Sequence, residues 1–238
     1  MVSFIVPAHN EEASIVHCLS AIVAAMEAVA SEHEVIVVDD SSTDATVRYA
    51  LEHGAQVIRV EHRNIAKTRN SGANEARGDV LFFVDADTLI SAEIVHSALR
   101  VIEEGAAGGG CVPRFEEQMP LWFHLFYPVL VIVSRWVLRQ TGGACVFCTR
   151  EAFAASGGFS EIHFAAEEVG WIKGIKRHGR FVVLRETVVT SGRSVRAQSP
   201  WTIARILVRF IVRGPDGFRD RRGLDLWYRP FRDKAPPA

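Results

Sequence analysis

Apolar and polar residues follow one another along the first 104 residues in blocks that predict four strands and four helices. Four short runs are largely apolar, as expected of strands buried on both faces of a sheet, and longer segments with apolar residues at helical spacing follow them. The predicted strands are residues 3–8, 33–40, 56–61 and 80–84, and the predicted helices are residues 11–30, 45–53, 65–76 and 91–104. Asn10 stands where it would cap the first helix. This alternation with short joints predicts an α/β fold whose mostly parallel central sheet is covered by helices on both faces.

The second half of the chain is less regular. A glycine run leads into a predicted strand, and a long apolar stretch, residues 119–138, is interrupted by His124, Ser134 and Arg135 and is expected to break at Pro128. The other predicted elements are strands at 111–115, 144–148 and 181–184, a helix at 167–178 and an amphipathic helix at 200–213. A basic and aromatic tail follows the last helix.

Composition narrows the class of protein. The 238 residues suit one large domain, or one domain with a small appendage, and the formal net charge of −1 does not favour nucleic acid as a partner. The four cysteines follow no disulfide or zinc pattern and are expected to be buried apolar residues of a reducing compartment. The sequence enters its first strand with no basic leader, so a cytoplasmic location is expected.

Two carboxylates end the fourth predicted strand. Asp85 and Asp87 follow the apolar run 80–84 directly, and ligands of open α/β sheets bind at this end of the strands. Two carboxylates so close repel each other unless a cation lies between them, and oxygen ligands favour Mg²⁺ or Mn²⁺. The alternative is that Asp87 only caps the helix at 91–104 and that Asp85 is solvated.

Further acidic residues follow the first two strands. Glu11 comes after strand 3–8, and Asp39 and Asp40 end strand 33–40. Any one of them alone is more simply a cap or a turn residue, but together they place several carboxylates on one rim. Carboxylates accept hydrogen bonds from ribose hydroxyls and base N–H groups, so this pair of clusters suits a nucleoside, whereas the Asp-x-Asp suits a metal that bridges a diphosphate. Neither of the glycine-rich phosphate-binding loops G-x-G-x-x-G and G-x-x-x-x-G-K-[ST] is present.

Five motifs follow one another in the first 180 residues: Pro7-Ala8-His9-Asn10-Glu11-Glu12, Val38-Asp39-Asp40-Ser41-Ser42-Thr43-Asp44, Lys67-Thr68-Arg69-Asn70-Ser71-Gly72, Val84-Asp85-Ala86-Asp87, and Gly157-Gly158-Phe159-Ser160-Glu161 followed by Glu167-Glu168. In this order they resemble the motifs of family 2 glycosyltransferases, which have the Rossmann-like GT-A fold. The resemblance implies a metal-dependent, inverting transferase with a nucleotide-sugar donor, a UDP-sugar by default and a GDP-sugar as the second choice. It also implies a catalytic domain at 1–192, with a donor half at 1–115 and an acceptor half at 116–192, and a C-terminal segment at 193–238.

The same resemblance assigns roles to individual residues. Glu11 and Asp40 match the positions that hold the nucleoside, with Asp39 beside Asp40. Pro7 and Ala8, at the end of the strand before Glu11, belong to the same donor-binding set. Lys67 and Arg69 match the basic pair next to the diphosphate, and Asp85, Ala86 and Asp87 match the donor-side Asp-x-Asp. Asp87 is expected to be the direct metal ligand, with Asp85 as the second, and the cofactor to be Mn²⁺ or Mg²⁺.

The acid pair at the start of the helix at 167–178 matches the position of the family's catalytic base. That base is usually Asp, and here the pair is Glu167-Glu168, so Glu168 is the expected base and Glu167 the reserve; the alternative is that the pair only complements the helix dipole. Many relatives supply a metal-binding His after the last core strand, but this chain has none at 188–193. Arg193 and Arg196 in that region are candidates to clamp the diphosphate.

The acceptor is the least determined partner. A saccharide, a lipid-linked molecule or another hydroxyl compound all remain open. The aromatic stretch at 121–136 and the basic helix at 200–213 suit peripheral membrane contact at the inner face of the membrane, or else packing on the sheet or a homodimer contact. Two other functions compete: a non-catalytic nucleotide-sugar sensor, which has no need of Glu168, and a sugar nucleotidyltransferase, which needs a glycine-rich basic motif that residues 7–12 do not provide.

Overall fold

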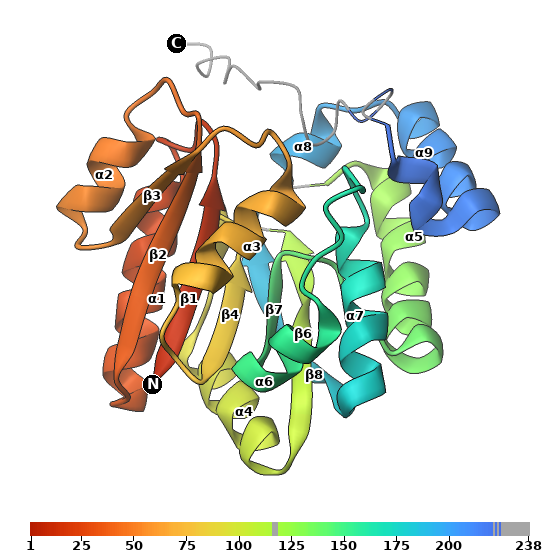
Figure 1. Cartoon of the computed structure of the whole chain (residues 1–238). Helices are drawn as coiled ribbons and strands as arrows, with labels where there is room; N and C mark the ends of the chain where they lie inside the picture. The colour runs from red at the N-terminus through yellow and green to blue at the C-terminus, as the bar shows by residue number, and fades with distance from the viewer. Residues whose placement is uncertain (116–118, 221, 223, 225–238) are drawn as a thin grey trace.

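A computed structural model of the chain describes residues 1–115, 119–220, 222 and 224, and its centre is one eight-stranded sheet (Figure 1). The strand order is β3-β2-β1-β4-β7-β6-β8-β5. The strands are β1 (Val2–Ala8), β2 (His33–Asp40), β3 (Gln56–Val60), β4 (Val80–Val84), β5 (Thr88–Leu89), β6 (Ala106–Phe115), β7 (Cys145–Thr149) and β8 (Arg180–Thr190). The helices are α1 (Ile15–Val29), α2 (Thr46–Glu52), α3 (Ile65–Glu75), α4 (Ala92–Glu103), α5 (Leu121–Ile132), α6 (Arg150–Ser156), α7 (Glu167–His178), α8 (Arg193–Arg196) and α9 (Pro200–Arg213).

The sheet is mostly parallel, which confirms the predicted fold class. β1 pairs in parallel with β2 and with β4, β2 pairs in parallel with β3, and β6 pairs in parallel with β8. β7 is the exception in the middle of the sheet, because it runs antiparallel to both β4 and β6. The carboxyl ends of β1, β2 and β4 therefore meet at one edge, as the sequence predicts.

Helices cover both faces of the sheet and enclose two apolar cores (Figure 1). One core packs α1 and α4 against the sheet, through residues such as Ile22 and Ile94. The other packs α3, α6 and α7 against the opposite face, through residues such as Ala73 and Trp171. All four cysteines are free and buried, as expected.

Several predicted boundaries are wrong, and each has a local reason. α1 starts at Ile15 rather than at residue 11, because Asn10 adopts a left-handed conformation (φ 55°) and accepts a hydrogen bond from Thr43 N at 2.8 Å instead of capping the helix. Pro128 does not break α5, which passes through it. The glycine run belongs to β6: a Cβ on Gly109 would lie 2.3 Å from Val182 O, so the close approach of β8 requires glycine there.

Two helical segments stand apart from the two cores. α5 continues as the π-helical turn η1 (Val133–Leu138), and the stretch Leu121–Leu138 is the one helix of the described residues that is long and apolar enough to cross a membrane. α9 is followed by the 3₁₀ turn η2 (Gly214–Phe218), and Phe218 packs with Ala165 and Phe210 in a small third cluster. The basic tail predicted after α9 lies largely outside the described residues.

Candidate active site

Five acidic residues lie at the edge of the sheet where β1, β2 and β4 end. Glu11 follows β1, Asp39 and Asp40 are the last two residues of β2, and Asp85 and Asp87 follow β4. The N–H of Asp85 donates to Ala144 O at 3.0 Å, which fixes the turn after β4 against the strand β7. The sequence prediction of one carboxylate rim therefore agrees with the topology of the sheet.

Arg69 joins this rim to the acid pair of α7. Its side chain is 1% exposed, and its guanidinium lies 2.7 Å from Asp85 Oδ1 and 2.5 Å from Glu167 Oε1. It also donates to Gly143 O at 3.0 Å. Burial alone would lower the pKa of Arg69, but the charges of Asp85 and Glu167 raise it above its ordinary value, so the side chain remains a cation. Arg69 thus lies inside the protein, between two carboxylates, rather than on an open diphosphate surface.

Asp87 is held by the strand that returns to it from the far end of the chain. β5 pairs antiparallel with the end of β8, in the register Thr88 to Thr190, and Thr190 Oγ1 donates to Asp87 Oδ1 at 3.3 Å. The loop after β8 then brings Arg193 to the rim, where its guanidinium contacts Glu11 Oε2 and lies 3.6 Å from Asp87 Oδ2. Arg193 is therefore placed between two of the predicted donor-side carboxylates.

The electrostatics of the rim favour a cation. Burial, followed by the charges of Glu11 and Asp85, raises the pKa of Asp87 to about 7, and the contact with Arg193 only partly offsets this. Burial also raises the pKa of Glu11, although Arg193 acts against it. A cation that lowers this mutual repulsion would bind the ionised forms.

The residues present fit a divalent ion, with limits. Asp85 and Asp87 offer hard oxygen ligands of the kind that Mg²⁺ and Mn²⁺ prefer. Across residues 1–115, 119–220, 222 and 224, no three His, Cys, Asp or Glu side chains form a ready-made metal cage. Among these residues, Asp85 and Asp87 are therefore the side chains that would hold an ion at this edge of the sheet.

Asp39 and Asp40 are both buried, but their carboxylates accept different numbers of hydrogen bonds. Asp40 accepts hydrogen bonds from His62 N and Arg63 N at 2.8 and 2.9 Å and from Asn64 N at 3.2 Å, and Thr68 Oγ1 adds another at 3.1 Å. Asp39 accepts one from Ser42 N at 3.2 Å. Asp40 thus anchors the loop before α3, whereas Asp39 accepts fewer hydrogen bonds from the protein.

The acid pair starts α7, and its two members have different surroundings. Glu167 is buried and paired with Arg69, whereas no described side chain forms an ion pair or hydrogen bond with the Glu168 carboxylate. Burial, followed by the charge of Glu167, raises the pKa of Glu168 to about 8. A carboxylate with this pKa is a stronger base than an ordinary glutamate, as a general base for a hydroxyl requires.

The remaining predicted residues lie around these groups. Pro7 and Ala8 are buried at the end of β1, and Ala86 is buried between the two aspartates of the Asp-x-Asp. Lys67 is half-buried near the start of α3, and within the described part of the chain no carboxylate lies within ion-pair distance of its ammonium group. Arg196 ends α8.

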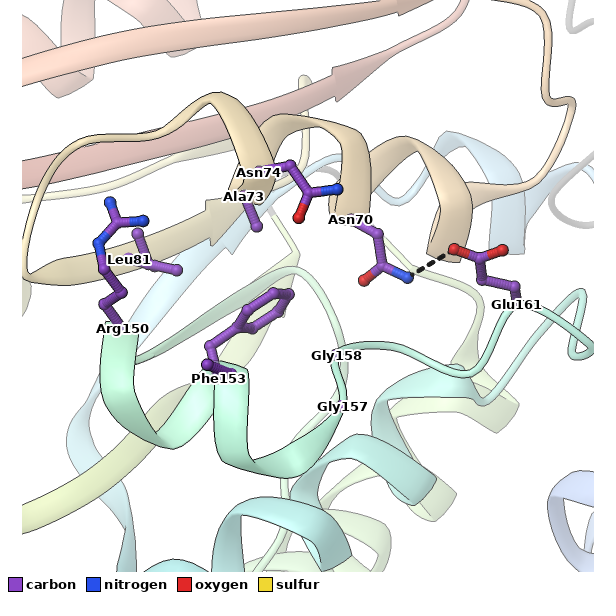
Figure 2. Close-up of a pocket in the computed structure, with 10 residues that line it drawn as sticks. Asn70, Ala73, Asn74, Leu81, Arg150, Phe153, Gly157, Gly158 and Glu161 are labelled. Carbon is purple, nitrogen blue, oxygen red and sulfur yellow. Dashed lines mark hydrogen bonds between the residues drawn. The ribbon is translucent and has the colours of Figure 1, made fainter.

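A separate groove lies between α3 and α6 and has a volume of about 430 Å³. Its lining includes Asn70, Arg150 and Phe153 (Figure 2). At one end the side chain of Asn70 donates to Glu161 Oε1 at 3.0 Å (Figure 2). None of the rim carboxylates lines this groove, so it is separate from the candidate active site.

The sequence analysis missed two residues of the site. Asn64 caps α3, accepting from Lys67 N at 3.0 Å, and its amide holds the carbonyl oxygens of Glu161 and His163, which precede α7. Thr190 holds Asp87. Asn64 could have been found as a polar residue directly before a helix, but Thr190 depends on the pairing of β5 with β8, which a two-residue strand does not reveal.

Comparison with known proteins gives one family. The model of glycosyl transferase family 2 matches residues 3–165. The undecaprenyl-phosphate 4-deoxy-4-formamido-L-arabinose transferase of Shewanella sediminis is 30% identical over 153 residues, which are 59% of this chain and 44% of that protein. The dolichyl-phosphate beta-glucosyltransferase of Drosophila melanogaster is 41% identical over 98 residues, 36% of this chain and 30% of that protein. The chain spans less than half the length of these relatives.

Solved structures give the fold. TarS 1-349 of S. aureus in complex with UDP-GlcNAc matches with a TM-score of 0.64 and 21% identity, covering 90% of this chain and 67% of that one. The mannosyltransferase PcManGT of Pyrobaculum calidifontis, in complex with GDP-Man and Mn²⁺, matches with a TM-score of 0.67 and 23% identity, covering 87% and 60%. The expected GT-A fold is confirmed.

Proposed function

The chain belongs to glycosyl transferase family 2, and on that basis we propose that it transfers a sugar from a nucleoside-diphosphate sugar to an acceptor, with inversion at the anomeric carbon. The observation that carries this proposal is the rim itself. On the proposed donor side, the negative charges of Glu11 and Asp85 add to that of Asp87, so a cation would stabilise this group. On the other side, Glu168 follows Glu167, the partner of Arg69, and its pKa is raised to about 8.

The donor is proposed to bind along the ends of β1, β2 and β4. Asp39, which accepts one hydrogen bond from Ser42 N, is the carboxylate proposed to accept hydrogen bonds from a nucleoside, and Asp40 holds the loop before α3. UDP-sugars are the first choice and GDP-sugars the second, since structural neighbours of this chain are complexes with UDP-GlcNAc and with GDP-Man. Lys67 and Arg193 are the cations proposed to meet the charge of the diphosphate.

Asp87 and Asp85 are the residues proposed to hold Mn²⁺ or Mg²⁺. When bound, such an ion supplies charge stabilisation for the departing diphosphate. The protein's own contribution is to hold Asp87 through Thr190 and to keep Asp85 in place through Arg69.

Glu168 is proposed to remove the proton from the acceptor hydroxyl. The acceptor oxygen forms a bond to the anomeric carbon while the bond from that carbon to the diphosphate breaks, the nucleoside diphosphate leaves, and the proton goes to Glu168. Glu167 remains paired with Arg69 and fixes the start of α7. A raised pKa suits this role, because it brings proton affinity close to working pH.

A lipid phosphate is the second candidate acceptor. It is supported by two relatives whose names give undecaprenyl phosphate and dolichyl phosphate. A phosphate is already an anion at neutral pH and has no need of a base, so the raised pKa of Glu168 favours a hydroxyl.

The test of this proposal is donor binding followed by donor consumption. A panel of UDP- and GDP-sugars, with and without Mn²⁺, is expected to contain at least one donor that raises the melting temperature only when the metal is present. The same donor should be consumed slowly by hydrolysis. Glu168→Gln should keep the melting shift and lose consumption, and a protein that binds no nucleotide sugar at all would refute the proposal.

A further inference from the structure

One face of the α5–η1 helix is apolar and open to solvent. The side chains of Leu121, Leu125, Val129, Ile132 and Trp136 follow one another at spacings of three or four residues, which places them in one stripe. Leu121, Leu125 and Trp136 are 79, 75 and 74% exposed. Apolar surface of this extent on a soluble domain marks an interaction site rather than ordinary variation.

The opposite face of the same helix is tied to the sheet. Phe123 packs edge-on against Phe115 at the end of β6, with ring centroids 5.2 Å apart, and the Tyr127 hydroxyl donates to Pro113 O. Arg135 in η1 donates to Leu184 O of β8. A helix held along its length by a folded domain can lie on a membrane surface but not cross it, although its 18 residues would be long enough.

A second apolar stripe lies on α9. Trp201 is 83% exposed, and Val208 and Val212 follow it on the same face, also exposed. Arg205 and Arg213 are exposed on the same helix, beside this stripe. Figure 1 shows α5 and α9 on the same side of the molecule, at the right of the view. Exposed Trp residues beside exposed arginines are typical of segments at a membrane–water interface.

The charges of the two segments select the partner. Residues 119–140 and 200–213 contain five arginines and no Asp or Glu, although the whole chain has a formal net charge of −1. An anionic surface complements this charge. A second copy of the chain would bring the same arginines to a two-fold interface, where they would repel each other.

We propose that the α5–η1 and α9 stripes bind peripherally to an anionic lipid bilayer. This inference rests on the proposed function, because membrane binding would bring the site to an acceptor that is carried on a lipid. α9 is linked to the catalytic side of the site: Phe210 stacks on Phe218 with ring centroids 6.2 Å apart, and Phe218 packs against Ala165, two residues before Glu167. A membrane-bound α9 therefore keeps the start of α7 close to the lipid surface.

The experiment is flotation of the whole chain with vesicles, which needs no catalysis. Vesicles of phosphatidylcholine alone are compared with vesicles that contain about 30% phosphatidylglycerol, at about 0.1 M and about 1 M NaCl. The wild-type protein is expected to float with the anionic vesicles at low salt and to be released at high salt. Leu125→Glu with Val129→Glu should lower the bound-to-free ratio by about tenfold or more. Arg205→Glu with Arg213→Glu should lower it by about 30-fold or more.

Leu51→Glu is the matched control, because Leu51 is an exposed leucine on α2, on the other side of the molecule in Figure 1. It should float like the wild type. A wild-type protein that stays in the soluble fraction overturns the proposal, and so does flotation that the Leu125→Glu/Val129→Glu variant retains. A stable dimer in light scattering that this variant dissociates, without flotation of the wild type, would assign the surface to a second copy.

Melting shifts with nucleotide sugars, measured on the same samples, separate the two proposals. A protein that binds its donor and does not float loses only the membrane proposal. A protein that floats and binds no donor loses the proposed function.

Discussion

Replacing Arg69 by methionine tests whether the site depends on a buried charge network. The substitution keeps an unbranched side chain of similar length and removes the guanidinium. Glu167, whose side chain is 5% exposed, and Asp85 then face each other's charge without the cation that now lies 2.5 and 2.7 Å from them. Both the ion pairs and the hydrogen bond to Gly143 O are lost.

The expected loss of stability is large. Removing one partner of a buried ion pair costs about 3–5 kcal/mol, because the remaining charge is left uncompensated. For a domain of this size each kcal/mol lowers the melting temperature by roughly 2–4 °C, so a decrease on the order of 6–20 °C is expected.

The assay is urea unfolding of four proteins: wild type, Arg69→Met, Glu167→Gln and the double variant. If Arg69 and Glu167 stabilise each other, the double variant should be more stable than the sum of the single losses predicts, by about 1–3 kcal/mol. Arg48→Met is the control, since Arg48 pairs with Glu52 at 3.9 Å on the surface, and it should change stability by less than about 0.5 kcal/mol. The reasoning is refuted if Arg69→Met unfolds within about 0.5 kcal/mol of the wild type, or if the single losses simply add.

Other predictions concern the carboxylates one at a time. Asp87→Asn should abolish metal-dependent donor binding, which calorimetry measures. It should also raise the free energy of unfolding at pH 8 by about 1–3 kcal/mol, because it removes a charge that burial and Glu11 disfavour. A variant that is less stable than the wild type in urea unfolding at pH 8 would contradict this. Asp40→Ala should destabilise the protein by about 2–4 kcal/mol through its loop, whereas Asp39→Asn should weaken nucleotide binding with little loss of stability, as melting curves with and without nucleotide would show. The transfer rate should fall as pH drops below about 8, because the base form of Glu168 is then lost; a flat profile from pH 6 to 9 would oppose the assignment. Because the pKa of Glu168 is raised from 4.5 to about 8 in the folded state, its contribution to stability is fully present below about pH 4.5 and is lost as pH rises through about 8. Between these two pH values, the free energy of unfolding measured in urea should therefore fall less for Glu168→Gln than for the wild type.

The elements with local sequence signals could be predicted. β2 and β4 have the predicted limits, since each is an apolar run ended by aspartate. In the second half of the chain, α7 also has its predicted limits, because the acid pair marks its start. The rim followed in turn, because parallel neighbouring strands end at the same edge.

The rest depends on contacts that no local pattern records. β6 includes three glycines that a propensity rule reads as a loop, and the tight packing of Gly109 against β8 is what makes them a strand. The antiparallel insertion of β7 and the two-residue pairing of β5 with β8 are likewise tertiary. Arg69 was expected at the diphosphate because of its place in a motif, and only the fold shows that α3 points it inward, between Asp85 and Glu167.

The position of Arg193 has a thermodynamic consequence for ligand entry. Its guanidinium already balances Glu11 and Asp87, so a metal ion that arrives alone competes with a resident cation. A diphosphate that draws this side chain toward itself leaves the two carboxylates short of positive charge. If the rim binds a metal ion and a nucleoside diphosphate as proposed, the two binding events are coupled, and reciprocity requires each ligand to tighten the other's binding by the same factor.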